Sequence, residues 1–310
     1  MKDLLSSRVA YGKSLVELGK TNPKVVVLDA DLSKATQTVQ FSEEFPERFF
    51  DMGIAEQNMM SCAAGMATFG LIPFVSTFAV FASMRAVEQI RNFIAYPKLN
   101  VKIVATHAGV EVGQDGATHQ AIEDIAILRA IPNMVVIAPA DWVSTKKAVQ
   151  AIAEYQGPVY MRVGRSDHEP VYQSDFKFEI GKSVQLRSGK DLTIIAIGNM
   201  VSKALSVAEE LSKLGFSIRV IDMHTVKPLD ETAVIDAAKE TKGIITVEDH
   251  TIIGGLGSAV SETLSSYNLA PVIRIGIQDR FGQSGIGDEL LDYYGLSVSN
   301  IVDQSLEILK

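Results

Sequence analysis

The position of Glu56 makes it the first candidate for acid–base chemistry. After it, no charged residue occurs until Arg85. Burial of this uncharged segment would disfavour the ionised form of Glu56 and raise its pKa, which prepares a carboxylic acid to donate a hydrogen bond near neutral pH. A helix-capping or surface glutamate ahead of a core helix is the structural alternative. Position alone leaves both interpretations open.

A glycine-rich loop supplies the second set of candidates. It runs from His107 to His119 as HAGVEVGQDGATH, and its glycines permit tight backbone turns while Asp115 and both histidines stay available. A histidine can transfer protons near neutral pH, and paired histidines with a carboxylate can hold the hydroxyl groups of a polar substrate. Structural histidines remain an alternative. The spacing matches no short-range metal-ligand motif, so we expect no metal site in this chain.

Further polar and aromatic side chains follow the expected strands. Asp31 comes after the first strand, and Arg165 ends the last strand of the first half. Phe78 and Phe81 lie at the end of another strand, although their i, i+3 spacing is also typical of core residues. In open parallel sheets, ligands sit beyond the carboxyl ends of strands, so these positions are candidates for binding.

Two other motifs indicate little chemistry. The segment GGLGSAV at Gly254–Val260 resembles part of a dinucleotide fingerprint but lacks its full glycine spacing, so we expect a helix N-terminus packed against a sheet. Ser284 in GQSGIG belongs to no G-x-S-x-G elbow, and we interpret it as a loop residue. A hydrolase therefore has little support.

The elements that must position these residues alternate strand and helix, which indicates an α/β fold with parallel sheets covered on both faces. From residue 166 to 190 the alternation lapses into polar, proline-containing sequence and then resumes. We predict two doubly wound domains, a mostly parallel-sheet domain at 1–166 and a smaller one at 191–310, joined by a linker at 167–190. We expect strands at 24–30, 71–78, 101–106, 134–138, 159–163, 192–197, 218–223, 244–247 and 272–277, and helices starting near 7, 56, 82, 119, 143, 202, 257 and 288.

Composition narrows the class of protein. At 310 residues with 47% apolar residues, two globular domains with ample core are expected. A formal charge of −8 without basic runs argues against nucleic acid as a partner. Gly70 and Pro73 interrupt the uncharged segment, which argues against a membrane span. Cys62 is the single cysteine and the start MKDLLSSRVAYGK lacks the apolar core of a signal peptide, so we expect a cytoplasmic protein without internal disulfides.

Several segments of the chain together resemble one protein family. The resemblance is carried, in this order, by GIAEQNM, STFAVFASMRAVEQIRN, THAGVEVGQDGATHQAIEDIAILRAIPNMVVIAPAD and TVKPLD. Over nearly its whole length the chain resembles the C-terminal half of transketolase. The resemblance implies a pyrimidine-binding domain followed by a transketolase C-terminal domain. It also implies a thiamine-diphosphate enzyme that transfers a two-carbon ketol unit from a ketose phosphate to an aldose.

The resemblance also implies residues that contact the cofactor. Glu56 would hydrogen-bond a ring nitrogen of the aminopyrimidine and favour its imino tautomer. Phe81, with Phe78 near it, would pack on the aminopyrimidine ring. Asp31 and Ile54 would lie against the cofactor. The cofactor supplies the carbanion chemistry, and the protein fixes its tautomer and orientation.

The substrate residues implied by the resemblance lie in the glycine-rich loop and at two arginines. His107 and His119 would bind oxygen atoms of the ketose donor, with His119 the better candidate for proton transfer. Asp115 would hold a hydroxyl next to the reacting carbon. Arg8 and Arg165 would clamp the sugar phosphate, for which a planar fork of donors is well suited.

A missing motif implies a partner. The family's diphosphate-and-magnesium motif, a GDG followed some way on by an Asn, does not occur in this sequence. By the resemblance, this chain is the C-terminal subunit of a split transketolase. A separate N-terminal subunit carrying the GDG…N motif would bring Mg²⁺ and the diphosphate site. The expected assembly is α2β2, with thiamine diphosphate shared between unlike chains and sugar phosphates as substrates.

Two positions depart from the family pattern. Met84 stands where many transketolases carry a tyrosine beside the pyrimidine, and Ala35 lies near a position where a serine often reaches the substrate phosphate. The first departure bears on the stacking contacts and the second on the acceptor.

Three rival functions remain. A deoxyxylulose-phosphate synthase shares the loop but tends to carry an aspartate at the position of His107. A 2-oxo acid dehydrogenase beta subunit has the same two domains but lacks the GQDGATHQ loop. A catalytically silent structural partner is the non-enzyme alternative, and the joint presence of Glu56, His107, Asp115 and His119 argues against it.

Overall fold

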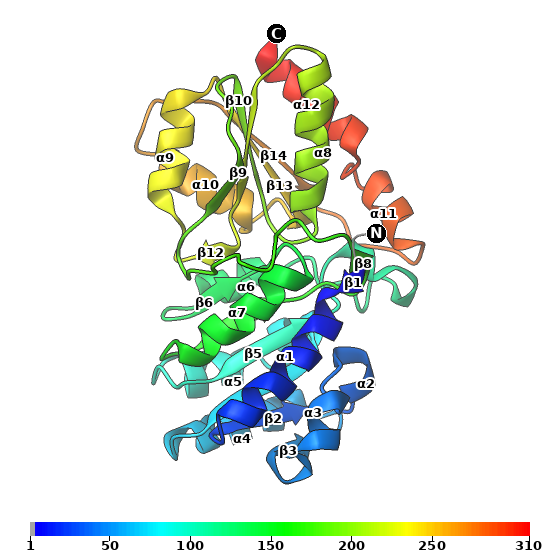
Figure 1. Cartoon of the computed structure of the whole chain (residues 1–310), viewed down its shortest axis with the longest axis vertical. Coiled ribbons are helices and arrows are strands. Elements are labelled where there is room, and N and C mark those ends of the chain that lie inside the picture. Colours follow the sequence, from blue (N-terminus) through cyan, green and yellow to red (C-terminus); the bar gives the residue numbers. More distant parts are fainter. Residues whose placement is uncertain (1–3) are drawn as a thin grey trace.

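The computed structural model describes residues 4–310 and shows two α/β units arranged along the long axis of the chain (Figure 1). The first unit contains a seven-stranded sheet in the order β12-β6-β7-β5-β4-β2-β3, in which the edge strand β12 runs antiparallel to β6. The strands are β2 (Val25–Asp29), β3 (Phe49–Asp51), β4 (Ile72–Phe78), β5 (Lys102–Thr106), β6 (Val135–Ile137), β7 (Val159–Arg162) and β12 (Thr225–Lys227).

The second unit contains a five-stranded sheet in the order β14-β13-β10-β11-β9, with β9 antiparallel at one edge. Its strands are β9 (Val184–Arg187), β10 (Leu192–Ala196), β11 (Ile218–Asp222), β13 (Ile244–Thr251) and β14 (Val272–Ile277). A two-stranded antiparallel pair joins β1 (Leu5–Ser6) to β8 (Asp167–His168). The predicted fold class, two mostly parallel α/β units with the smaller one second, is confirmed.

Helices cover both faces of each sheet (Figure 1). The first unit contains α1 (Ser7–Thr21), α2 (Ser33–Thr36), α3 (Val39–Glu44), η1 (Pro46–Arg48), α4 (Glu56–Thr68), η2 (Phe81–Arg85), α5 (Val87–Gln89), η3 (Ile90–Ala95), η4 (Val110–Asp115), α6 (Asp124–Ala130) and α7 (Trp142–Glu154). The second contains α8 (Met200–Lys213), α9 (Glu231–Glu240), α10 (Leu256–Leu264), α11 (Gly287–Tyr293) and α12 (Val298–Leu309).

Burial of the central strands follows from their apolar sequence. β2, β4 and β5 are buried along their whole lengths, as strands between two helical layers must be. Helices α1 and α7 pack on one face of the first sheet, and α4 and α6 pack on the other. The core on the α4 side includes Met59 and Ile103 and continues into the second unit at Ile195 and Val260. This apolar cluster is therefore shared by the two units.

Two expected helices differ from the structure. The helix expected from residue 119 begins at Asp124, because the Gln120 amide donates to the carbonyls of Val110 and Gly113 and holds the preceding residues in the loop. The helix expected from residue 82 contains two π-helical stretches, η2 and η3, on either side of α5. The short strands β3, β9 and β12 were not expected, since three or four residues carry too little periodicity to predict a strand. The ten-residue helix α9 was not expected either.

The segment after the first sheet is fixed to helix α7. Asp141 caps α7 through the backbone N–H of Ser144, and its second carboxylate oxygen accepts hydrogen bonds from the N–H groups of Val171 and Tyr172. The domain boundaries at 1–166, 167–190 and 191–310 stay a proposal. Strand β12 lies in the range 191–310 but pairs with β6 of the first sheet. Among residues 4–310, no helix combines the length and apolar character needed to cross a bilayer.

Candidate active site

Glu56 is the first residue of α4, and only 1% of it is exposed. Its carboxylate faces strand β4 and helix η2. One oxygen accepts a hydrogen bond from Thr77 Oγ1 at 3.2 Å, and the other is 2.8 Å from Arg85 Nη1. The surface and helix-capping interpretations are therefore wrong. The isolated acid expected from the uncharged segment is also wrong, because Arg85, at the far end of that segment, pairs with it.

Phe81 lies beside Glu56 and faces the same arginine. The Arg85 guanidinium carbon is 4.2 Å from the centroid of the Phe81 ring. Phe78 and Phe81 stack with centroids 5.8 Å apart, and Phe78 is buried while Phe81 is half-buried. Through Arg85, the aromatic pair therefore connects Glu56 to the histidines of the loop. Because Phe81 is half-buried, a simple core role does not account for it.

The two histidines of the loop meet on these aromatic rings. His107 stacks on Phe78 at 3.9 Å, and His119 approaches Phe81 edge-on at 5.4 Å. Burial, together with the positive charges of Arg8 and Arg165, lowers the pKa of His107 to about 3. His107 is therefore neutral at physiological pH, so one ring nitrogen is a donor and the other an acceptor.

The loop between the histidines needs its glycines, as predicted. Gly109, Gly113 and Gly116 have φ of 79°, 82° and 76°. A Cβ on Gly109 would lie 2.0 Å from a carboxylate oxygen of Asp249 in β13. Asp249 accepts hydrogen bonds from the backbone N–H groups of Val110 and Glu111 at 2.9 and 3.4 Å. The close approach of the backbone lets a residue of the second unit fix the loop.

Glu111 provides a second attachment of the loop, which the sequence analysis missed. Its carboxylate accepts a hydrogen bond from the Asn199 amide at 2.8 Å and lies 2.8 Å from His168 Nε2. The interaction with Glu111 raises the pKa of His168, although burial opposes the shift. These partners are far from Glu111 in the sequence, so no local motif could reveal them.

Two arginines converge at the entrance of the loop. Arg8 Nε donates to the carbonyl of Arg165 at 3.2 Å, and Arg8 Nη1 donates to the carbonyl of Ala35 at 3.0 Å. Arg165 Nη1 donates to Asp115 at 3.3 Å and to the carbonyl of Val112 at 2.7 Å. Burial and the neighbouring charge of Arg165 lower the pKa of Arg8. Two adjacent guanidinium groups form a site suited to an anion, although the carboxylates of Asp115 and Asp167 offset part of their charge.

The remaining predicted residues, Asp31 and Ile54, follow strands β2 and β3. Asp31 is exposed after β2, and its backbone N–H donates to Asp51. Ile54 is 75% exposed, two residues ahead of Glu56. Asp29, which no pattern in the sequence singled out, is buried and accepts hydrogen bonds from Thr36 and Thr38. Burial raises the pKa of Asp29 to about 6, and its bonds shape the turn that carries Ala35.

The glycine-rich GGLGSAV segment is a helix N-terminus, as predicted. Leu256 and Gly257 donate their backbone N–H groups to Glu248 at 2.7 and 2.8 Å. Burial raises the pKa of this carboxyl to about 7. Because a side chain of the same chain already accepts these donors, the segment does not present them to a dinucleotide phosphate. Ser284 lies in a loop beside Gly116, also as predicted.

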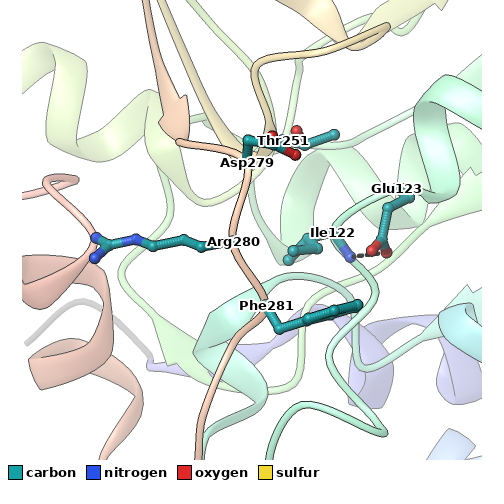
Figure 2. Close-up of a pocket in the computed structure, with 6 residues that line it drawn as sticks. All are labelled: Ile122, Glu123, Thr251, Asp279, Arg280 and Phe281. Carbon is teal, nitrogen blue, oxygen red and sulfur yellow. Dashed lines mark hydrogen bonds between the residues drawn. The ribbon is translucent and has the colours of Figure 1, made fainter.

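A cavity of about 160 Å³ lies next to the loop but apart from the residues above (Figure 2). Its lining comes from the entry to α6 and from the segment Asp279–Phe281. Figure 2 shows Arg280 extending to the side opposite Glu123, whose carboxylate accepts a hydrogen bond from the N–H of Ile122. Glu123 and Arg280 therefore do not converge on one point of this cavity.

The groups at Glu56 fit a flat ring that carries N–H donors. The Arg85 guanidinium is itself a flat group with N–H donors, and it packs on Phe81 while donating to Glu56. A planar nitrogen heterocycle placed on Phe81 would reach the same carboxylate. Within residues 4–310, no group of three or more His, Cys, Asp or Glu side chains is placed to hold a metal ion.

Comparisons with known proteins identify related families and related chains. Residues 4–170 match the family described as transketolase, pyrimidine binding domain, and residues 181–301 match transketolase, C-terminal domain. A Methanocaldococcus jannaschii protein with the provisional name transketolase C-terminal section is 56% identical over 98% of this chain and 96% of its own.

Two further relatives are similar over nearly their whole lengths. The 6-deoxy-6-sulfo-D-fructose transketolase subunit SqwH of a Clostridium species is 40% identical over 97% of this chain and 94% of its own. A solved structure described as "Split gene transketolase, inactive beta4 tetramer" shares 52% identity, covers 98% of both chains and superposes with a TM-score of 0.92.

Proposed function

The chain belongs to the transketolase family, as a C-terminal section of the split kind, and from this premise we propose that it is one subunit of a two-chain transketolase. The proposed reaction transfers a two-carbon ketol unit from a ketose phosphate to an aldose acceptor. The observation that carries this proposal is that buried Glu56 and Phe81 contact the same guanidinium, while the His107 and His119 rings pack on the Phe78 and Phe81 rings.

Glu56 and Phe81 would hold the aminopyrimidine of thiamine diphosphate. Bound there, the cofactor would supply the nucleophilic thiazolium carbon that accepts the ketol unit. Phe81 would orient the pyrimidine by stacking, and Glu56 would share a proton with a ring nitrogen and so select the tautomer. Phe78, Asp31 and Ile54 are the further proposed cofactor contacts of this chain.

The loop histidines would bind the donor substrate. His107 is neutral at physiological pH because its pKa lies near 3, so it would act as a hydrogen-bond partner of substrate oxygens. His119, which lies half-buried at the edge of Phe81, is the proposed proton-transfer group. Asp115, exposed beside Arg165, would accept a hydrogen bond from a substrate hydroxyl.

Arg8 and Arg165 would bind the phosphate of the sugar. Arg165 contacts Val112 and Asp115 of the loop, and Arg8 contacts the carbonyl of Arg165. Ala35 offers a methyl group and a backbone carbonyl at this place, and the carbonyl already accepts from Arg8. The phosphate contacts proposed for this chain therefore come from the two arginines.

The diphosphate and Mg²⁺ would be held by a separate N-terminal subunit. The sequence contains no GDG…N motif, and the related solved structure is described as an inactive tetramer of one chain type. Both observations support an active assembly of two kinds of chain, for which we propose α2β2. The cytoplasm is the proposed compartment.

The test is reconstitution from purified chains. Thiamine diphosphate, Mg²⁺, a ketose phosphate and an aldose acceptor would be added to this chain alone, to an N-terminal transketolase subunit carrying the GDG…N motif alone, and to the two chains together. We expect ketol transfer only from the mixture. Glu56→Gln should lower its kcat by about 10²- to 10⁴-fold without changing assembly measured by size-exclusion chromatography.

The matched control is Glu43→Gln, which changes an exposed carboxylate of α3 and should leave kcat unchanged. Full activity of this chain alone would refute the two-chain proposal. Full activity of the Glu56→Gln mixture would refute the role of Glu56 and favour a silent structural partner. Preference for a 2-oxo acid over a ketose phosphate would favour the dehydrogenase alternative.

A further inference from the structure

Arg85 binds the same two groups that we assign to the aminopyrimidine. Its guanidinium donates to Glu56 at 2.8 Å and covers the Phe81 ring at 4.2 Å. The other oxygen of Glu56 accepts from Thr77, a fixed side chain of the buried strand β4. The Arg85 side chain is 44% exposed, whereas that of Glu56 is 1% exposed. One partner of this ion pair can therefore turn into solvent and the other cannot.

The backbone of η2 brings Phe81 and Arg85 to one side. A π-helical turn closes between residues i and i+5, so residues i and i+4 fall nearly above one another. Phe81 and Arg85 have this separation and form the first and last residues of the π-helical stretch. The backbone of η2 thus places the two side chains close enough for the guanidinium to cover the ring.

We propose that Arg85 is an internal competitor of the cofactor, a side chain that occupies the place of the aminopyrimidine and must turn away before the ring can bind. This inference rests on the proposed function, because it takes the pyrimidine site from there. A ring stacked on Phe81 would collide with the guanidinium, and the Glu56 oxygen that faces Arg85 is the one still reachable from Phe81. The Arg85 guanidinium and the aminopyrimidine therefore cannot bind Glu56 and Phe81 at the same time.

The competition predicts the direction of a mutational effect on binding. The pyrimidine must replace an ion pair and a cation–π contact, so part of its binding free energy is offset by their loss. Removing Arg85 deletes that opposing contribution and leaves a buried carboxylate in need of a partner. Thiamine diphosphate should bind more tightly and faster when Arg85 is absent. A residue that only held the cofactor would show the opposite change.

The experiment measures cofactor binding to the reconstituted two-chain enzyme by isothermal titration calorimetry with thiamine diphosphate and Mg²⁺. We expect Arg85→Met to lower the Kd by about 5- to 30-fold relative to wild type. Arg85→Lys, which keeps the charge but loses the flat guanidinium, should give an intermediate Kd. Stopped-flow mixing should show a faster association rate for Arg85→Met.

The matched control is Arg91→Met, an exposed arginine of η3 that contacts Asn92 and should leave the Kd unchanged. Circular dichroism of each variant chain checks that it is folded. If the wild-type assembly binds thiamine diphosphate and both Arg85 variants have a Kd equal to or higher than that of wild type, the competition is overturned and the proposed function stands. A wild-type assembly that binds no thiamine diphosphate, or a Glu56→Gln assembly that binds it equally well, would overturn the proposed pyrimidine site and the competition with it.

Discussion

Among the individual side chains, the two arginines at the mouth of the loop have the clearest electrostatic role. Arg8 and Arg165 lie close enough for each charge to affect the other, and Asp115 neutralises part of the charge of Arg165. Two like charges held together by backbone carbonyls raise the free energy of the folded chain. A dianionic phosphate placed between them would remove that repulsion, which is why we assign this place to the sugar phosphate.

We predict that Arg8→Ala raises the KM of the reconstituted enzyme for a ketose phosphate by about 10- to 100-fold, the value of a hydrogen bond to a charged group. The kcat should change far less, since Arg8 lies at the entrance and not beside Phe81. Steady-state kinetics with a ketose phosphate and with the corresponding unphosphorylated ketose would measure the effect. Lys13→Ala, an exposed change in the same helix, serves as control. Equal losses with both ketoses would contradict phosphate binding by Arg8.

At the scale of elements, the loop from His107 to His119 depends on contacts from outside itself. Asp249 in β13 binds the start of η4, and Asn199 and His168 bind Glu111 within it. The Gln120 amide closes the loop against Gln283. A glycine-rich segment loses much conformational entropy on folding, so these contacts are needed to hold the histidines on the aromatic rings.

The contact between His168 and Glu111 should make stability depend on pH. The Glu111 carboxylate, 2.8 Å from His168 Nε2, raises the pKa of His168 above its ordinary value near 6.5. Protonated His168 therefore stabilises the fold fully below about pH 6.5, and this stabilisation is lost as the pH rises through the raised pKa. We predict that His168→Gln lowers the free energy of unfolding more at about pH 6 than at about pH 9. Urea titrations at both pH values would measure this, and a deficit that grows with pH would contradict it.

For the whole molecule, the junction between the two sheets combines apolar packing with one buried ion pair. Arg162 at the end of β7 binds the Asp124 carboxylate, with Nε at 3.0 Å from one oxygen. Its Nη2 also donates to the carbonyl of Asp249 in β13 at 2.7 Å. This side chain links the first sheet, helix α6 and the second sheet. The position of the loop between the two units depends on the same junction.

We predict that Arg162→Met lowers the free energy of unfolding by about 3–5 kcal/mol, because it leaves the buried Asp124 without its charged partner. Arg129→Met provides a matched comparison. The ion pair of Arg129 with Glu262 also joins α6 to α10, but Glu262 is largely exposed, so its loss should cost no more than about 1 kcal/mol. Urea unfolding followed by circular dichroism would compare the two variants. Equal costs would show that burial does not set the strength of this link.

The sequence determined the features that depend on neighbouring residues. Continuous apolar runs predicted the buried strands β2, β4 and β5, and the glycines of the loop predicted its backbone turns at Gly109, Gly113 and Gly116. The residues Glu56, Phe81, His107 and His119 could be selected because strand ends and an uncharged segment are local patterns, and the structure brings these four together. Their proposed roles came from the family resemblance.

Only the tertiary structure decided which groups bind one another across the chain. Arg85 reaches Glu56 over 29 positions, and Asp249 reaches Val110 over 139, so neither pairing leaves a periodic trace in the sequence. The same holds for β12, which leaves the second unit to join β6 at the edge of the first sheet. Burial and charge act between residues that are close in space. Glu56 therefore looks isolated along the sequence, but in the fold η2 brings Arg85 to it.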